Sequence, residues 1–416
     1  MSIRILRCLA VAAALLGVPA ALVMGAAPAS AQQQTVSNKV GVPLKAAQEL
    51  AKQKKFKEAL AKVEEAEKVP NLTPFEVLTI QKFKVYLYAQ LKEYNNAAKA
   101  MEAIIATGLP TADETKQYRR QIALLYFEGG NTAKGVAAAK DYLQRYGDDP
   151  DLLLLLAANA YKGGDYGSSA EAAQKIIRSA EAQGKKPDED ALVLLVNSEF
   201  YLKRTDPKHA DNYAAALEKL VGYYPKTAYW RDLLLNAESR PGLNSKYKLD
   251  LFVLKFTIGT LKQESEYIDM AETALVQNLP AYSQKVLEAG MKAGVVTDGA
   301  GGRNKRLLAT ATKRAGEEKV TPADEAEARN QATGESLGRL GQTYESYGDH
   351  AKAIALMKEA IAKGGLASID TVRLHLGVAQ LRGSQVAAGQ ATMRQVKTKD
   401  GSSDLARFWL LYSRQM

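Results

Sequence analysis

The stretch LGQTYESYGDHAKAIALMKEAI, residues 340–361, decides the fold. Gly341 and Ala353 are small and fall where two antiparallel helices would touch, and Gly348 lies in the turn between them. Large apolar residues recur every three to four positions on the outer faces, as in an amphipathic helix, at Leu340, Tyr344, Ile354, Met357 and Ile361. The stretch therefore predicts a helix–turn–helix unit that needs a neighbour to cover its apolar side.

Weaker copies of this unit recur along the chain. We track the small residue early in the second helix, which stands at Ala59, Ala97, Gly135, Ser169, Ala216, Ser283, Ala353 and Gly389. The intervals are 38, 38, 34, 47, 67, 70 and 36 residues, and the two longest are each close to two periods. We therefore expect diverged units near residues 228–262 and 303–333, and about ten helix pairs in all.

This pattern resembles the tetratricopeptide repeat (TPR) family, whose unit is a helix–turn–helix of about 34 residues. The resemblance is strong at 337–363 and moderate at 46–70 and 150–180. It implies an all-α fold, namely an α-solenoid of stacked helix–turn–helix repeats that forms a right-handed superhelix.

Local signals at the helix ends agree with this fold. Capping residues and first-turn prolines predict helix starts at Thr73-Pro74-Phe75-Glu76, Thr111 with Glu114, Asp149-Pro150 and Thr321-Pro322. Glycines predict helix ends at Gly108, Gly184 and Gly364.

The first 31 residues are typical of a secretory signal peptide. Arg4 and Arg7 precede an apolar run from Leu9 to Met24, and Ala29-Ser30-Ala31 is a small-x-small cleavage site. An N-terminal membrane anchor is the alternative, but the run is short for a bilayer span. We expect export with cleavage, followed by a disordered segment at 32–41.

The cysteine content and the net charge limit the cellular compartment and the class of partner that we expect. Cys8 is the only cysteine and lies inside the signal peptide, so the mature chain would have no disulfide, thiolate metal site or cysteine nucleophile. The signal and the lack of disulfides favour the periplasm and an exported bacterial TPR protein. The formal net charge is +10, or +8 without Arg4 and Arg7, and the basic residues alternate with acidic ones along the expected helices. Solvated helix faces are therefore favoured over a nucleic-acid site.

We divide the mature chain into three parts. Residues 42–240 form an N-terminal TPR-like solenoid, residues 241–302 are diverged helical repeats with hinge-like loops, and residues 303–416 are C-terminal TPR-like repeats with a terminal helix. The segment Glu238–Tyr247, with Arg240-Pro241-Gly242, and the glycine-rich segment Gly294–Asn304 break the rhythm. Each is a hinge or a long loop between repeats.

No motif in the chain carries recognisable chemistry. The three histidines, His209, His350 and His375, are far apart and have no second ligand at metal spacing. We therefore predict no enzyme activity, no cofactor, and no catalytic, cofactor-binding or metal-binding residue. A glycan-processing solenoid stays open, because distant repeats can bring an acid pair together.

The TPR resemblance implies a binding groove lined by the first helix of each unit. The residues that it selects as groove contacts are Lys82, Tyr86, Gln90, Arg120, Phe127, Glu128, Tyr161 and Lys162, with Leu124 and Ala158 beside them. Aromatic side chains beside cations suit a peptide with apolar anchors and some acidic character. The alternative for Tyr86, Phe127 and Tyr161 is packing between units. A second aromatic cluster is an interface or a core, at Tyr223, Tyr224, Tyr229 and Trp230.

These observations predict a non-enzymatic periplasmic TPR scaffold that mediates protein–protein interaction in the bacterial cell envelope. Its partner would be a protein or peptide, with no nucleic acid and no membrane span after signal cleavage. The alternative is an envelope protein that binds a glycan, lipid or peptide ligand. The sequence specifies neither the partner nor the oligomeric state.

Overall fold

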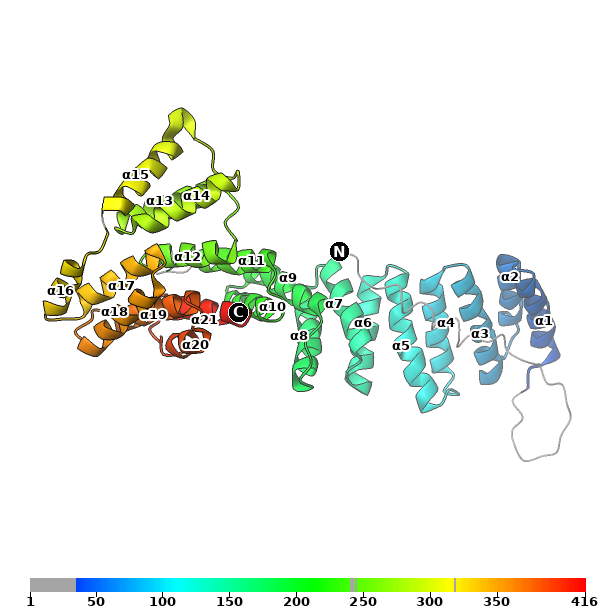
Figure 1. Ribbon diagram of the computed structural model, residues 1–416. Coiled ribbons are helices and arrows are strands. Elements are labelled where there is room, and N and C mark those ends of the chain that lie inside the picture. The colour runs from blue at the N-terminus through cyan, green and yellow to red at the C-terminus, as the bar shows by residue number, and fades with distance from the viewer. Residues whose placement is uncertain (1–34, 240–242, 244, 318) are drawn as a thin grey trace. The chain divides into compact units, whose positions relative to one another are not determined.

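The computed structural model describes residues 35–239, 243, 245–317 and 319–416, which contain twenty-one α-helices and no strand (Figure 1). The expected signal peptide at 1–31 and the Arg240-Pro241-Gly242 segment lie outside the described residues. No helix in these ranges is long and apolar enough to cross a bilayer. The all-α repeat fold that the sequence predicts is confirmed.

The chain divides into an N-terminal unit, Met1–Tyr213, and a C-terminal unit, Ala214–Met416. The N-terminal unit contains α1 (Asn38–Lys52), α2 (Phe56–Glu67), α3 (Pro74–Gln90), α4 (Tyr94–Ala106), α5 (Ala112–Glu128), α6 (Thr132–Tyr146), α7 (Pro150–Lys162), α8 (Tyr166–Ala182) and α9 (Glu189–Thr205). Helix α10 (His209–Tyr223) crosses the boundary.

Helices of the N-terminal unit pack as TPR-like hairpins, α1 with α2, α3 with α4, α5 with α6 and α7 with α8. Each second helix also packs on the first helix of the next hairpin. The core is accordingly a row of clusters, one around Leu44, Val63 and Leu87 and the next around Met101 and Tyr126. Each hairpin is therefore stabilised by its neighbours, as in other repeat arrays.

The small residues that mark the repeats are confirmed as points of close approach. All eight are buried. At Gly135 an added Cβ would lie 2.4 Å from Cδ1 of Phe127, and at Gly389 it would lie 2.7 Å from Cγ of Leu381. The two helices of these hairpins pack too closely to admit a larger residue.

The predicted helix ends are also confirmed. Thr73 with Glu76, and Thr111 with Glu114, form reciprocal capping boxes at the starts of α3 and α5. Asp149 caps α7, and Gly364 ends a helix of the C-terminal unit with φ of +76°.

One expectation near the N-terminus is wrong. Residues 32–34 of the segment 32–41, expected to be disordered, lie outside the described residues. The rest of it is helical from Asn38 onward, and Val40 and Gly41 are buried. The backbone N–H of Ser37 donates to Glu76 Oε1 at 2.9 Å, which ties the start of α1 to α3. Contacts with the next hairpin therefore order a stretch whose polar composition suggested disorder.

The C-terminal unit contains α11 (Thr227–Glu238), α12 (Lys248–Ile258), α13 (Glu264–Val276), α14 (Pro280–Lys292), α15 (Arg303–Glu317), α16 (Pro322–Asn330), α17 (Glu335–Tyr347), α18 (His350–Lys363), α19 (Ile369–Arg382), α20 (Val386–Met393) and α21 (Ser402–Ser413). A 3₁₀ turn, η2 (Ala300–Gly302), precedes α15. Hairpins α13/α14, α17/α18 and α19/α20 are well packed, and α21 packs on α12, α19 and α20. Phe408 and Trp409 of this terminal helix are buried.

The diverged unit expected near 303–333 does not form a packed hairpin of its own. Helix α15 packs against α14, whereas α16 packs against α17. The reason is a lack of apolar surface, since α16 has nine residues and buries only Ala328. The unit expected near 228–262 does form a contacting pair, α11 with α12. The domain limits 42–240, 241–302 and 303–416, and the right-handed superhelix, stay predictions.

Candidate functional site

The first helices of the N-terminal unit form a common surface. Helix α1 contacts α3, α5 contacts α7, and α7 contacts α9. Each second helix reaches the next hairpin through that hairpin's first helix. We call the exposed side of α3, α5, α7 and α9 the first-helix face. In stacked helical hairpins, such a row of adjacent helices lines the inner side of a curved array.

Four of the eight residues predicted for the groove project into solvent. These are Lys82 and Gln90 of α3, Glu128 of α5 and Lys162 of α7, all of which are exposed. They provide polar groups of both signs along the first helices.

Arg120 joins two hairpins. Its Nε lies 2.7 Å from Asp149 Oδ2, and its guanidinium also lies 3.7 Å from Asp151. Asp149 caps α7 at the same time, because its Oδ1 accepts the Leu152 N–H. Burial alone would raise the pKa of Asp149, but the hydrogen bonds and charge of Arg120 leave it below its usual value. The guanidinium therefore holds α5 against the start of α7.

Two of the predicted aromatic residues fill space between helices. The ring of Tyr86 packs edge-on to Phe56 at 6.3 Å, within the cluster formed by α1, α2 and α3. The ring of Phe127 covers Gly135 inside the α5/α6 hairpin. Both rings are half-buried, so packing accounts for most of their surface.

Tyr161 belongs to an aromatic cluster that sequence analysis did not identify. Its ring lies 5.5 Å from Tyr166 and 6.1 Å from Tyr201, and these two stack on each other at 4.4 Å. Phe200 extends the cluster to Tyr213, with centroids 5.7 Å apart. We call these five residues of α7, α8, α9 and α10 the aromatic cluster. The sequence shows Tyr166 after Gly164-Asp165 and the dipeptide Phe200-Tyr201. It does not show that these side chains pack together.

Cations border the aromatic cluster. Lys203 Nζ lies 3.7 Å from the centroid of Tyr213 and 5.2 Å from that of Phe200, and the Arg204 guanidinium lies 6.0 Å from Phe200. Burial lowers the pKa of Lys203. The Phe200 side chain is 39% exposed, so an apolar edge remains in contact with water beside two cations. Such a surface suits a partner with apolar and acidic side chains.

The second aromatic group, in the C-terminal unit, is divided between core and surface. Trp230 is 1% exposed and belongs to the core. Tyr223, Tyr224 and Tyr229 are half-buried. The core interpretation therefore holds for Trp230.

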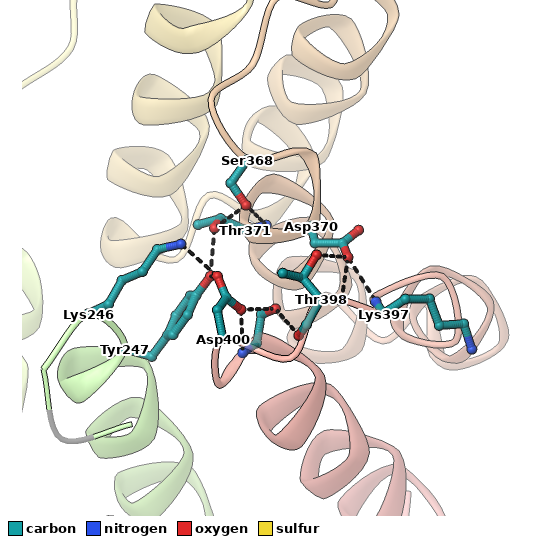
Figure 2. A network of polar contacts seen from close by, with 9 residues as sticks. Lys246, Tyr247, Ser368, Asp370, Thr371, Lys397, Thr398 and Asp400 are labelled. Atoms are coloured by element: carbon teal, nitrogen blue, oxygen red, sulfur yellow. Dashed lines mark hydrogen bonds and ion pairs between the residues drawn. The ribbon is translucent and has the colours of Figure 1, made fainter. Parts of the chain in front are cut away.

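A polar network in the C-terminal unit joins the starts of α12 and α19 to the loop before α21 (Figure 2). Asp400 accepts hydrogen bonds from Lys246 Nζ at 2.8 Å and from the Tyr247 hydroxyl at 2.9 Å. Asp370 accepts the backbone N–H groups of Lys397 and Thr398 at 2.8 and 2.9 Å. Ser402 and Thr398 donate further hydrogen bonds to Asp400 and Asp370, so the two carboxylates hold these loops together.

A second network of the same unit is largely buried. His375 Nε2 lies 2.8 Å from Asp250 Oδ1, and Arg382 pairs with Glu345 and donates to the Tyr282 hydroxyl at 3.1 Å. These groups come from α12, α14, α17 and α19. Within the described ranges, no three His, Cys, Asp or Glu side chains gather as a metal site.

Comparisons with known proteins give structural likenesses only. No family model and no curated protein matches the chain. A TPR protein from Parabacteroides merdae is similar at 9% identity and a TM-score of 0.30, over 81% of this chain and 99% of that one. Naa15/Naa10 bound to HypK is similar at 15% identity and a TM-score of 0.36, over 86% of this chain and 53% of that one. The chain therefore spans about half the length of that matched protein. The TPR2AB domain of yeast Sti1 in its pHSP90 complex is similar at 13% identity and a TM-score of 0.24, over 73% of this chain and 100% of that one.

Proposed function

We propose that this chain is a non-enzymatic scaffold that binds a protein partner on the first-helix face of the N-terminal unit, in the periplasm of a bacterial envelope. One observation carries the binding site, namely the aromatic cluster, whose Phe200 edge is 39% exposed beside Lys203 and Arg204. Aromatic and arginine side chains are enriched in binding hot spots. The partner segment would have apolar anchors and acidic residues.

The polar residues of the same face support an extended partner. Lys82, Glu128 and Lys162 are exposed on α3, α5 and α7, three first helices of successive hairpins. A peptide that runs across these helices would meet alternating charges before it reaches the cluster. Because the helices are rigid and already packed, little conformational entropy is lost by the scaffold on binding.

A matched pair of variants tests the site. Phe200→Ser removes the exposed ring, and Leu235→Ser removes a similarly exposed apolar residue, 42% exposed, from α11. We expect affinity capture from a periplasmic extract to lose its partner with Phe200→Ser by about tenfold or more. Leu235→Ser should leave capture unchanged. Equal capture by both variants would contradict a site at the aromatic cluster.

Photo-crosslinking locates the partner directly. A benzophenone amino acid in place of Lys162 lies on the first-helix face, whereas one in place of Lys175 lies on the second helix of the same hairpin. The partner should form an adduct with the first position and not with the second. Adducts at Lys175 alone would move the binding surface to the second-helix side.

The periplasmic setting is supported by the sequence of residues 1–31 and needs its own test. The intact mass of the protein purified from a fractionated bacterial host should correspond to a chain that begins at Gln32. The protein should then appear in the periplasmic fraction. A full-length chain retained in the membrane fraction would favour the N-terminal anchor instead.

A further inference from the structure

A cleft lies on the second-helix side of the N-terminal unit, between α4 and α6 and above α5. Its volume is about 480 Å³, within the range of small-molecule sites of about 300–1,000 Å³. The floor and walls are apolar and consist of Ile105, Ala106, Ile122, Ala137 and Ala138. Charged side chains and one tyrosine stand at its ends, at Glu102, Arg119, Tyr126, Lys134 and Asp141.

Small side chains on α6 open this cleft. Relative to the repeat marker, Ala137 corresponds to Lys99 in the preceding hairpin and to Glu171 in the following one. Ala138 corresponds to Ala100 and Ala172, which are 4% and 2% exposed, whereas Ala138 is only half-buried. The gap between neighbouring hairpins is therefore wider here than at the equivalent positions on either side.

One end of the cleft is polar but close to neutral. The Tyr126 hydroxyl donates to Glu102 Oε1 at 2.8 Å, and Lys134 Nζ lies 5.3 Å from the Tyr126 ring. Burial and the hydrogen bond to Glu102 raise the pKa of Tyr126 to about 12, so the phenol stays protonated. The opposite charges of Glu102 and Lys134 balance, and the ring of Tyr126 presents an apolar surface to the cleft.

At the other end, Asp141 of the lining pairs with two guanidinium groups, of which Arg119 lines the cleft and Arg145 is not among the lining residues. Arg119 NH1 lies 2.8 Å from Asp141 Oδ2, and Arg145 Nε lies 2.7 Å from Asp141 Oδ1. Two guanidinium groups thus share one carboxylate. A guanidinium has five N–H donors, so Arg119 retains donors for a second anion.

We infer that this cleft binds a free medium-chain fatty acid, with its carboxylate at Arg119 and its chain over Ile122 and Ala138 toward Tyr126. The volume and the apolar floor fit one unbranched chain, whereas a phospholipid carries two. The N–H donors that Arg119 retains favour an anionic head group over a neutral one. This site is separate from the first-helix face, so it gives the chain a ligand-binding role besides partner binding.

Binding of decanoate to the full chain, measured by equilibrium dialysis below its micelle concentration, tests the assignment. We expect saturable binding with one site, and at least tenfold weaker binding of decanol, which has the same chain without the charge. Arg119→Gln should weaken decanoate binding about tenfold, while Arg178→Gln, the same charge change at an exposed position of α8, should not. Ala137→Trp fills the cleft and should abolish binding. Ala133→Trp, at an exposed position of α6 that does not line the cleft, should not.

A diazirine-bearing fatty acid locates the site without depending on how the variants fold. The adduct should map to α4, α5 or α6 near Ile105, Ile122 or Ala138. Adducts elsewhere, equal affinity for decanol, or binding that survives Ala137→Trp would each overturn the inference. Because these measurements do not involve the protein partner, they leave the proposed scaffold function untouched.

Discussion

The Nε2 atom of His375 lies 2.8 Å from Oδ1 of Asp250, which joins helices separated by 125 residues of chain. Both side chains are only 14% exposed. Burial alone would lower the pKa of His375, but the charge and hydrogen bond of Asp250 and the charge of Glu345 leave it above its usual value. Asp250 therefore favours the charged form of His375, and the contact fastens α12 to α19.

Asp250→Asn should destabilise the C-terminal unit by about 3 kcal/mol, because it removes the carboxylate that pairs with His375 and stabilises its charged form. Asp269→Asn, an exposed carboxylate of α13, is the matched control and should have little effect. Urea unfolding followed by tryptophan fluorescence measures the difference. Both tryptophans of the chain, Trp230 and Trp409, are buried in the C-terminal unit, so the signal reports on that unit. Equal midpoints for the two variants would contradict a stabilising pair.

The same pair predicts a loss of stability at alkaline pH. A histidine whose folded-state pKa is raised stabilises fully below its unfolded pKa of about 6.5 and loses this contribution as pH rises through the folded value. Glu345, whose pKa burial raises, acts in the same direction. Burial lowers the pKa of His350, so its titration acts below pH 6.5 and does not obscure the effect. The C-terminal unit should therefore unfold more easily at pH 8.5 than at pH 6.5, and His375→Gln should flatten this slope. An unchanged slope in the variant would assign the pH dependence to other groups.

Local signals made much of the fold predictable. The capping box joins Thr73 to Glu76, three positions later. The small residue at Ala59 or Gly135 is followed within the same helix by apolar residues that pack in the same core. These interactions are short in sequence, so a pattern can reveal them. Contacts such as that of His375 with Asp250 depend on how hairpins stack, which no local pattern encodes. Helices α15 and α16 show the same limit, since the interval between repeat markers predicted a unit there but α16 buries only Ala328 and packs on α17.

The candidate site was predictable in part. The TPR resemblance selects Lys82 and Lys162 by their spacing on the first helices, and both are exposed. The stacking of Tyr166 on Tyr201 does not, because it joins the first turn of one helix to the last turns of the next. Sequence spacing also could not separate Tyr161, which joins the aromatic cluster, from Phe127, which covers Gly135 inside its hairpin.

Gly135→Ala should destabilise the N-terminal unit by about 1–3 kcal/mol. The new Cβ would lie 2.4 Å from Phe127 Cδ1, so the ring must move, and this cost exceeds the gain in helix propensity of about 1 kcal/mol. Gly167→Ala, at the start of α8, meets no atom closer than 3.8 Å and should be neutral or stabilising. Far-UV circular dichroism during thermal unfolding measures both. The double variant with Phe127→Leu should recover part of the loss, and additive losses would argue against a direct clash.

Asp370→Asn should cost roughly 2 kcal/mol at neutral pH, because hydrogen bonds from Lys397 and Thr398 hold the pKa of this carboxyl at about 2, against an ordinary value of 3.8. Burial opposes this lowering but does not outweigh it. A depressed pKa stabilises above the unfolded value and loses its contribution as pH falls through the folded one. The difference between variant and wild type should therefore shrink between about pH 4 and pH 2. Urea midpoints at pH 7 and pH 3 measure it, and a difference independent of pH would attribute the loss to packing.

Removal of α21 should unfold much of the C-terminal unit and spare the N-terminal one. A chain that ends at Gly401 lacks Leu405, Phe408 and Trp409, all buried, and their burial contributes roughly 6 kcal/mol. It also lacks Arg407, whose Nε lies 2.8 Å from Glu218 of α10. A chain that ends at Arg414 loses only two exposed residues and serves as the control. Hairpins of a repeat array depend mainly on their neighbours. Hydrogen exchange of α1–α8 should therefore match wild type in both truncated chains. Protection of the amides of α12 and α19 should be lost only in the shorter chain. Loss of protection throughout the shorter chain would show that the two units fold as one.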